Sequence, residues 1–186
     1  MNQHILMGGL LVLFLLSGCL FGGDATNTAQ QLAGVRASYV PTGTLVPSLL
    51  VQREAYRNEL LPFRNTIRSI VGSEGTALNH YLDGTLELLE MVNHTDEALQ
   101  LLSNVNLDAP ECSANSPISK AIQRIEDARE NAQQASDDFA AVQENISMTN
   151  ALGVDYLQRA EQTARGVSET HAERVKELKI ACGFSS

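Results

Sequence analysis

A seven-residue apolar repeat is the feature that most constrains how the second half of this chain folds. One row consists of Ile118, Ile125, Ala132, Phe139 and Ile146, and a second row, three positions on, of Ala121, Ala128, Ala135 and Val142. Two such rows are typical of a long α-helix that packs against other helices along one seam. Because the second row is mostly alanine, a partner helix can approach closely there. Ser116 and Pro117 suit the N-cap and first helical position, since proline has no N–H to leave unpaired.

A less regular version of the same pattern predicts a further helix over 151–182. One row consists of Leu157, Ala164, His171 and Leu178, and the other of Ala160, Val167 and Ala181, interrupted by Arg174. We expect Arg174 to pair with an acidic residue of the preceding helix. We expect His171 to be a partly buried, hydrogen-bonded member of the seam, with a pH-sensing role as the alternative. Gly183 suits the position just after the helix C-cap.

Cys112 and Cys182 test whether these two helices form a hairpin. A disulfide needs Cα atoms within about 7 Å of each other, whereas one unbroken helix over 117–182 would place its ends about 97 Å apart. A hairpin brings the cysteines together only if its turn lies near residue 147, their midpoint, and the apolar pattern breaks at 148–150. We therefore predict a Cys112–Cys182 disulfide. Two free thiols or a metal pair are the alternative, which no Cys-x-x-Cys spacing supports.

Helical periodicity also dominates the first half of the chain. A helix over 48–71 is indicated by Leu49, Tyr56, Leu60, Phe63, Ile67 and Ile70, and one over 76–104 by Leu78, Leu82, Leu86, Leu89, Val92, Leu99 and Leu102. Pro62 should kink the first of these near 58–61. A short helix over 28–40 can precede them, and 105–116 reads as a loop. No sustained two-residue alternation requires a strand.

The sequence thus predicts an all-α fold. We expect residues 45–186 to form an antiparallel, up-down-up-down four-helix bundle with long coiled-coil-like helices. A signal peptide and a short tether precede this domain in the predicted organisation.

The first residues of the chain have the pattern of a targeting signal rather than of a folded domain. Residues 5–18 form an uncharged, mostly apolar run, which has the length of a signal-peptide core and falls short of the roughly 20 residues that span a bilayer. The run ends in Leu16-Ser17-Gly18-Cys19. This tetrapeptide resembles the lipobox of prokaryotic (bacterial or archaeal) lipoproteins.

The resemblance implies that the Cys19 thiol is alkylated with diacylglycerol and that the chain is cut just before it. Two acyl chains anchor a protein stably, whereas one gives only marginal binding. Residues 1–18 are then a signal peptide, and 19–44 hold the lipidated cysteine, a tether over 20–28 and the possible short helix. The domain would face the extracytoplasmic side of the cell membrane, where a disulfide can persist. The alternative is an uncleaved membrane anchor over 5–21.

Charge and motifs exclude several classes of function. The net charge of −9, from 22 acidic and 13 basic side chains, argues against nucleic acid, because phosphate binding needs clustered Lys and Arg. No hydrolase, metalloprotease, phosphate-loop or dinucleotide motif occurs. We expect neither enzymatic activity nor a cofactor.

Some weaker signals remain in the sequence. Glu90 and His94 share a helix face as weak metal-ligand candidates. The Glu-x-x-His motif of carboxylate-bridged metal sites in bundles is absent, so we expect a solvated helix face there instead. Asn93 and Asn145 match the N-glycosylation acceptor, which matters only in a host with that pathway.

The sequence predicts location better than activity. We expect a membrane-anchored, exported lipoprotein whose helical domain is a non-enzymatic interaction or structural module at the cell envelope. Its partners would be the membrane, through lipid on Cys19, and a protein or envelope component. The alternative is a receptor or enzyme domain that binds a small ligand or a metal inside the bundle. We favour the first because the inward rows carry few polar side chains, which such a site would need.

Overall fold

A computed structural model of the chain describes residues 24–106 and 110–183. Its helices are α2 (Ala25–Tyr39), α3 (Leu50–Leu60), α4 (Phe63–Arg68), α5 (Ser73–Leu102), α6 (Pro117–Gln143), α7 (Ile146–Leu152) and α8 (Val154–Ala181). These described ranges contain no strand, which confirms the all-α fold class. The predicted signal peptide and Cys19 lie outside them.

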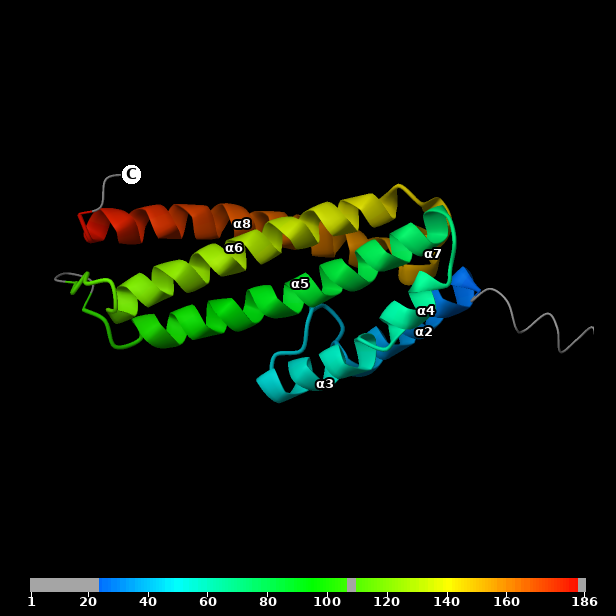
Figure 1. Cartoon of the computed structure of the whole chain (residues 1–186), viewed down its shortest axis with the longest axis horizontal. Helices are drawn as coiled ribbons and strands as arrows, with labels where there is room; N and C mark the ends of the chain where they lie inside the picture. The colour runs from blue at the N-terminus through cyan, green and yellow to red at the C-terminus, as the bar shows by residue number, and fades with distance from the viewer. Residues whose placement is uncertain (1–23, 107–109, 184–186) are drawn as a thin grey trace, which may run out of the picture.

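Three long helices form the body of the domain. Helix α6 packs along α5 on one side and along α8 on the other, and each neighbour runs antiparallel to it (Figure 1). Ion pairs cross both contacts: Arg124 of α6 lies 2.7 Å from Glu97 of α5, and Lys179 of α8 lies 2.7 Å from Glu126 of α6. The α6–α8 pair is the hairpin that the cysteine positions predicted.

The predicted helix over 48–71 is two helices, α3 and α4. Helix α3 ends where the Leu61 N–H donates to the Arg57 carbonyl, and α4 begins at Phe63. Pro62 stands between them and, lacking an N–H, cannot continue the hydrogen-bond ladder. Both helices pack against α5, with Arg64 of α4 2.8 Å from Asp83. A regular four-helix up-down bundle is therefore not confirmed.

Helix α2 begins at Ala25, three residues before the predicted start. Asp24 explains the difference, because its carboxylate accepts hydrogen bonds from the N–H groups of Thr26 (3.0 Å) and Asn27 (3.4 Å). An aspartate at the N-cap satisfies backbone donors that otherwise have no partner. The helix packs on α7 and α3 and buries Leu32 fully. The segment over 24–28 therefore belongs to the folded domain and not to the predicted tether.

The connection between α6 and α8 contains a short helix, α7, where the sequence predicted only a turn. The predicted break at 148–150 lies inside α7, which Asn145 caps by accepting from the N–H of Met148 at 3.1 Å. Gly153 ends this helix with a φ of 101°, a conformation that glycine adopts without strain. Because α6 ends at Gln143, Ile146 leaves the heptad register and is 76% exposed, so its predicted burial is wrong.

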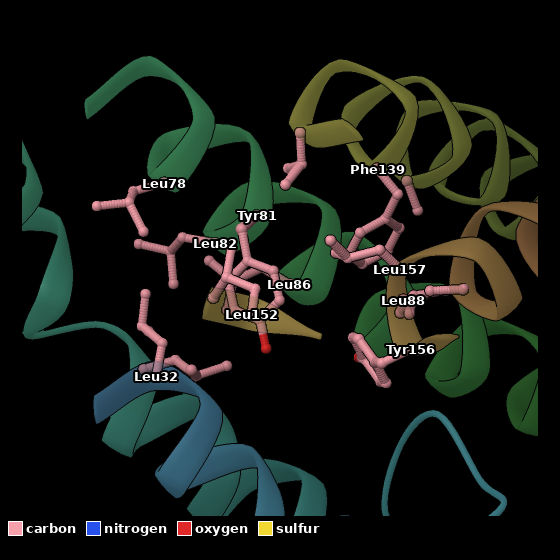
Figure 2. Close-up of a cluster of buried hydrophobic side chains, with 14 of the residues drawn as sticks. Leu32, Leu78, Tyr81, Leu82, Leu86, Leu88, Phe139, Leu152, Tyr156 and Leu157 are labelled. Atoms are coloured by element: carbon pink, nitrogen blue, oxygen red, sulfur yellow. The ribbon is translucent and has the colours of Figure 1, made fainter. Parts of the chain in front are cut away.

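Apolar burial divides into two clusters. The larger one draws on α2 and α5–α8 as well as α3 and α4, and Figure 2 shows part of it between the helices. The smaller one lies at the disulfide end and consists of Ala98, Ile118, Ile122, Ile125, Val175 and Leu178, with the two cysteines packed against it. Apart from Ile146, both predicted rows of α6 are buried. Leu99 of α5, one of the apolar positions that indicated this helix, is 62% exposed.

Gly75 marks a place where the fold requires glycine. A Cβ atom built there would lie 2.0 Å from the carbonyl oxygen of Ile70. The backbone that follows α4 therefore passes directly over the first turn of α5. Gly72, in the same connection, has a φ of 96°. Together these two glycines permit the tight reversal between α4 and α5.

Candidate functional site

All four tyrosines of the chain lie in the larger cluster or pack against it. The rings of Tyr39 and Tyr56 stack with centroids 5.5 Å apart, and Tyr81 and Tyr156 lie 6.4 Å apart. Arg36 of α2 joins the second pair: its guanidinium carbon lies 3.9 Å from the Tyr156 ring centroid, and its Nη1 donates to the Tyr81 hydroxyl at 3.2 Å. Arg36 thus connects α2 to both α5 and α8.

The electrostatics of this cluster favour a structural role over a catalytic one. Burial raises the pKa of Tyr81, and the Arg36 guanidinium only partly opposes the shift. Burial likewise raises the pKa of Tyr156, whose hydroxyl donates to the carbonyl of Leu45 at 3.4 Å. Both phenols therefore stay protonated at neutral pH and serve as hydrogen-bonding groups, Tyr81 accepting from Arg36 and Tyr156 donating to Leu45, rather than as bases or nucleophiles. They tie α2 and the loop after it to the long helices.

A second polar group connects α3 to the middle of α5. Arg53 is buried, and its guanidinium donates to the Asn93 side-chain oxygen at 2.8 Å, to the Ser48 carbonyl at 3.0 Å and to the Asp96 carboxylate. A buried guanidinium needs such partners to offset its lost hydration. The sequence reasoning missed Arg53. The only indication of this buried group in the sequence is the position of Arg53 on the apolar side of the helix predicted over 48–71.

The weak metal candidates, Glu90 and His94, both lie on α5. Arg57 forms an ion pair with the Glu90 carboxylate, and a guanidinium at that position repels a metal cation. His94 places its buried Nδ1 3.9 Å from Glu97, without a hydrogen bond. Within residues 24–106 and 110–183, no three His, Cys, Asp or Glu side chains are grouped so as to hold a metal ion.

The two acceptor asparagines both have structural contacts. Asn93 is partly buried and receives the hydrogen bond from Arg53. Asn145 caps α7, and its Nδ2 lies 3.5 Å from Ser73 Oγ at the start of α5. The side chain of Asn145 thus links the α6–α7 turn to the α4–α5 turn.

His171 lies in the seam between α8 and α5. Its Nε2 is 3.0 Å from Thr95 Oγ1, and the side chain is partly buried. Arg174, one turn on, contacts Glu177 of its own helix at 3.0 Å instead of an acidic residue of α6. Lys179 makes the predicted kind of cross-helix pair in its place, with Glu126.

Burial lowers the pKa of His171, which gives a pH-dependent contribution to stability. The unfolded chain then binds the proton more tightly than the folded one. Stability from this group is present above the ordinary imidazole pKa of about 6.5 and is lost as the pH falls below it. Urea unfolding between pH 5 and 7.5 should therefore show a shallower acid-side decline for His171→Gln than for the wild type. Parallel profiles would contradict this assignment.

The disulfide end holds the predicted cysteine pair. The sulfur atoms of Cys112 and Cys182 are at bonding distance, and their Cα atoms are 5.5 Å apart. The bond links the segment before α6 to the C-cap of α8. On the surface of the same end, an open groove between the end of α5 and the start of α6 is lined by both apolar and polar residues, among them Leu101, Lys120 and Arg124.

Fold and contacts thus define a disulfide-linked, all-helical domain in which the side chains of Arg36 and Arg53 join helices through polar contacts. No protein-family model, no curated protein and no solved structure matches the chain. In the part of the chain that the structure describes, no helix is both long enough and apolar enough to cross a membrane. Cys19, the predicted lipidation site, lies outside that part.

Proposed function

We propose that this protein is an exported lipoprotein, anchored to the cell membrane by lipid on Cys19 and facing the extracytoplasmic side. The Cys112–Cys182 disulfide is the observation that carries the proposal. Disulfides persist in oxidising compartments outside the cytosol. Export is also what the apolar segment and Leu16-Ser17-Gly18-Cys19 imply. The covalent bond and the leader thus indicate the same compartment by separate chemistry.

The helical domain, in this proposal, is a non-enzymatic interaction or structural module for a protein or another envelope component. Support comes from two inner arginines whose polar contacts join helices: Arg36 binds two tyrosines, and Arg53 binds Asn93 and Asp96. We also propose that α3 and α4 together take the place of the fourth helix of an up-down-up-down bundle.

A Cys19→Ser variant tests the anchor. The full chain, produced in a bacterial host and in parallel in an archaeal host, should partition into the detergent phase and carry lipid on an N-terminal Cys19 by mass spectrometry. The variant should lose the lipid and remain unprocessed. The Cys112→Ser/Cys182→Ser double variant is the matched control and should still be lipidated. An unmodified Cys19 in both hosts, or stoichiometric Fe, Zn or Mn in the purified protein, would overturn the proposal.

A further inference from the structure

The start of the folded domain is close to Cys19 along the chain. Asp24 caps α2, so residues 20–23 are all that separates it from Cys19. Five Cα–Cα steps of at most about 3.6 Å give a maximum reach of about 18 Å. Helix α5 alone, with 30 residues, is about 45 Å long. The beginning of α2 therefore stays next to the membrane in every orientation that the anchor allows, whereas the disulfide end does not.

The beginning of α2 shares its end of the molecule with two turns. Figure 1 shows the start of α2, the α4–α5 turn and the α6–α7 turn together at one end of the long axis, opposite the end where α8 finishes. Asn145 and Ser73 connect the two turns at 3.5 Å. We call this end, defined by Ala25 and the two turns, the α2 end.

The α2 end carries the two most exposed large apolar side chains of the described residues. Val71 in the α4–α5 turn is 94% exposed, and Ile146 at the start of α7 is 76% exposed. Single exposed apolar residues are common on protein surfaces and by themselves indicate nothing. Here both stand on adjoining turns at the end that the tether holds beside the bilayer.

The charges at this end favour an apolar contact over an electrostatic one. Glu74 and Glu144 flank the two turns, while Arg68 supplies one cation at the end of α4. Such a surface is not attracted to anionic headgroups. Two apolar side chains bind a membrane weakly on their own, but an anchor within about 18 Å keeps their effective concentration at the bilayer high.

We propose that the α2 end rests on the lipid surface of the anchoring membrane, with Val71 and Ile146 contacting the headgroup–acyl boundary. The inference depends on the proposed lipid anchor at Cys19. It fixes the orientation of the module: the disulfide end, with its open groove between α5 and α6, points away from the bilayer.

The chain has no tryptophan, so one introduced indole reports its own surroundings. Val71→Trp and Ile146→Trp, each made in the lipidated full chain and reconstituted in phosphatidylcholine vesicles, should be quenched strongly by phospholipids with brominated acyl chains. Leu99→Trp is the matched control, because Leu99 is also exposed and lies about 39 Å along α5 from its start. Its emission should change at most slightly. Indole has some affinity for the membrane interface, and the control carries the same indole.

Vesicle flotation in the same samples separates the two proposals. Protein that floats but shows no quenching at positions 71 and 146 would overturn this inference and leave the anchor intact. Equal quenching at positions 71, 146 and 99 would also overturn it, because the molecule would then lie flat. Failure to float would overturn the anchor and the inference with it. Flotation with quenching confined to positions 71 and 146 would establish the orientation.

Discussion

Reduction of the Cys112–Cys182 disulfide is expected to lower the free energy of unfolding by about 4 kcal/mol. The bond closes a loop of 70 residues, and opening it restores conformational freedom to the unfolded chain. For a domain of this size, a loss of about 4 kcal/mol corresponds to a melting temperature lower by roughly 8–16 °C. The disulfide end should loosen first, because its apolar cluster is the smaller of the two and both cysteines pack against it.

Thermal unfolding with and without dithiothreitol measures this effect. The Cys112→Ser/Cys182→Ser double variant should match the reduced wild type, and the reductant should not change its melting temperature further. Amide hydrogen exchange should speed up in the first turns of α6 before it does so near Phe139. A reductant effect of equal size in the double variant, or none in the wild type, would show that the bond does not stabilise the fold in this way.

The hairpin of α6 and α8 could be predicted because its signals are local or covalent. Heptad spacing reports which residues share a helix face, and Ser116 caps α6 as its position before Pro117 indicates. Gly183 has the positive φ expected after a helix C-cap. Cys112 and Cys182 then added the one long-range constraint that the sequence contains. Each inference used either a few neighbouring residues or a single covalent bond.

The predictions that failed concern how far along a helix another helix covers it. Periodicity shows that Leu99 belongs to the apolar stripe of α5, but not that α3 begins too late to cover it. Arg53, in the first turn of α3, contacts Asn93 and Asp96, so Leu99 lies beyond the point where α3 starts. The burial expected for Ile146 fails for a related reason, because α6 ends before the heptad position that Ile146 would occupy. Burial depends on helix lengths that the repeat does not specify.

The tyrosine cluster shows a different limit. Arg36 contacts Tyr81 and Tyr156, residues 45 and 120 positions away in the chain. The sequence around Arg36, Tyr81 and Tyr156 contains no pattern that indicates contact among these three residues. Such contacts follow from the way α2 packs against the long helices, which the sequence alone does not determine. The segment predicted as part tether and part short helix therefore turned out to supply a central polar contact.

Phe139→Ala is expected to cost about 3–5 kcal/mol of unfolding free energy, comparable to losing the disulfide. Phe139 is fully buried. Its ring meets those of Tyr81 and Tyr156 edge-on, with centroids 6.3 and 6.2 Å away. Figure 2 labels all three residues in the same buried cluster. Alanine would remove both aromatic contacts and leave a cavity that the surrounding rings cannot fill. Urea unfolding should show the full loss.

Ile146→Ala is the matched control, because Ile146 is the next member of the same heptad row. If the repeat alone determined burial, the two substitutions would both be costly. The structure ends α6 before Ile146 and leaves that side chain exposed, so the change should stay within about 0.5 kcal/mol. Phe139→Leu should fall between them, since leucine keeps apolar volume but loses the ring contacts. A loss at Ile146 as large as that at Phe139 would mean that α6 continues through the turn, and the arrangement of α7 would be wrong.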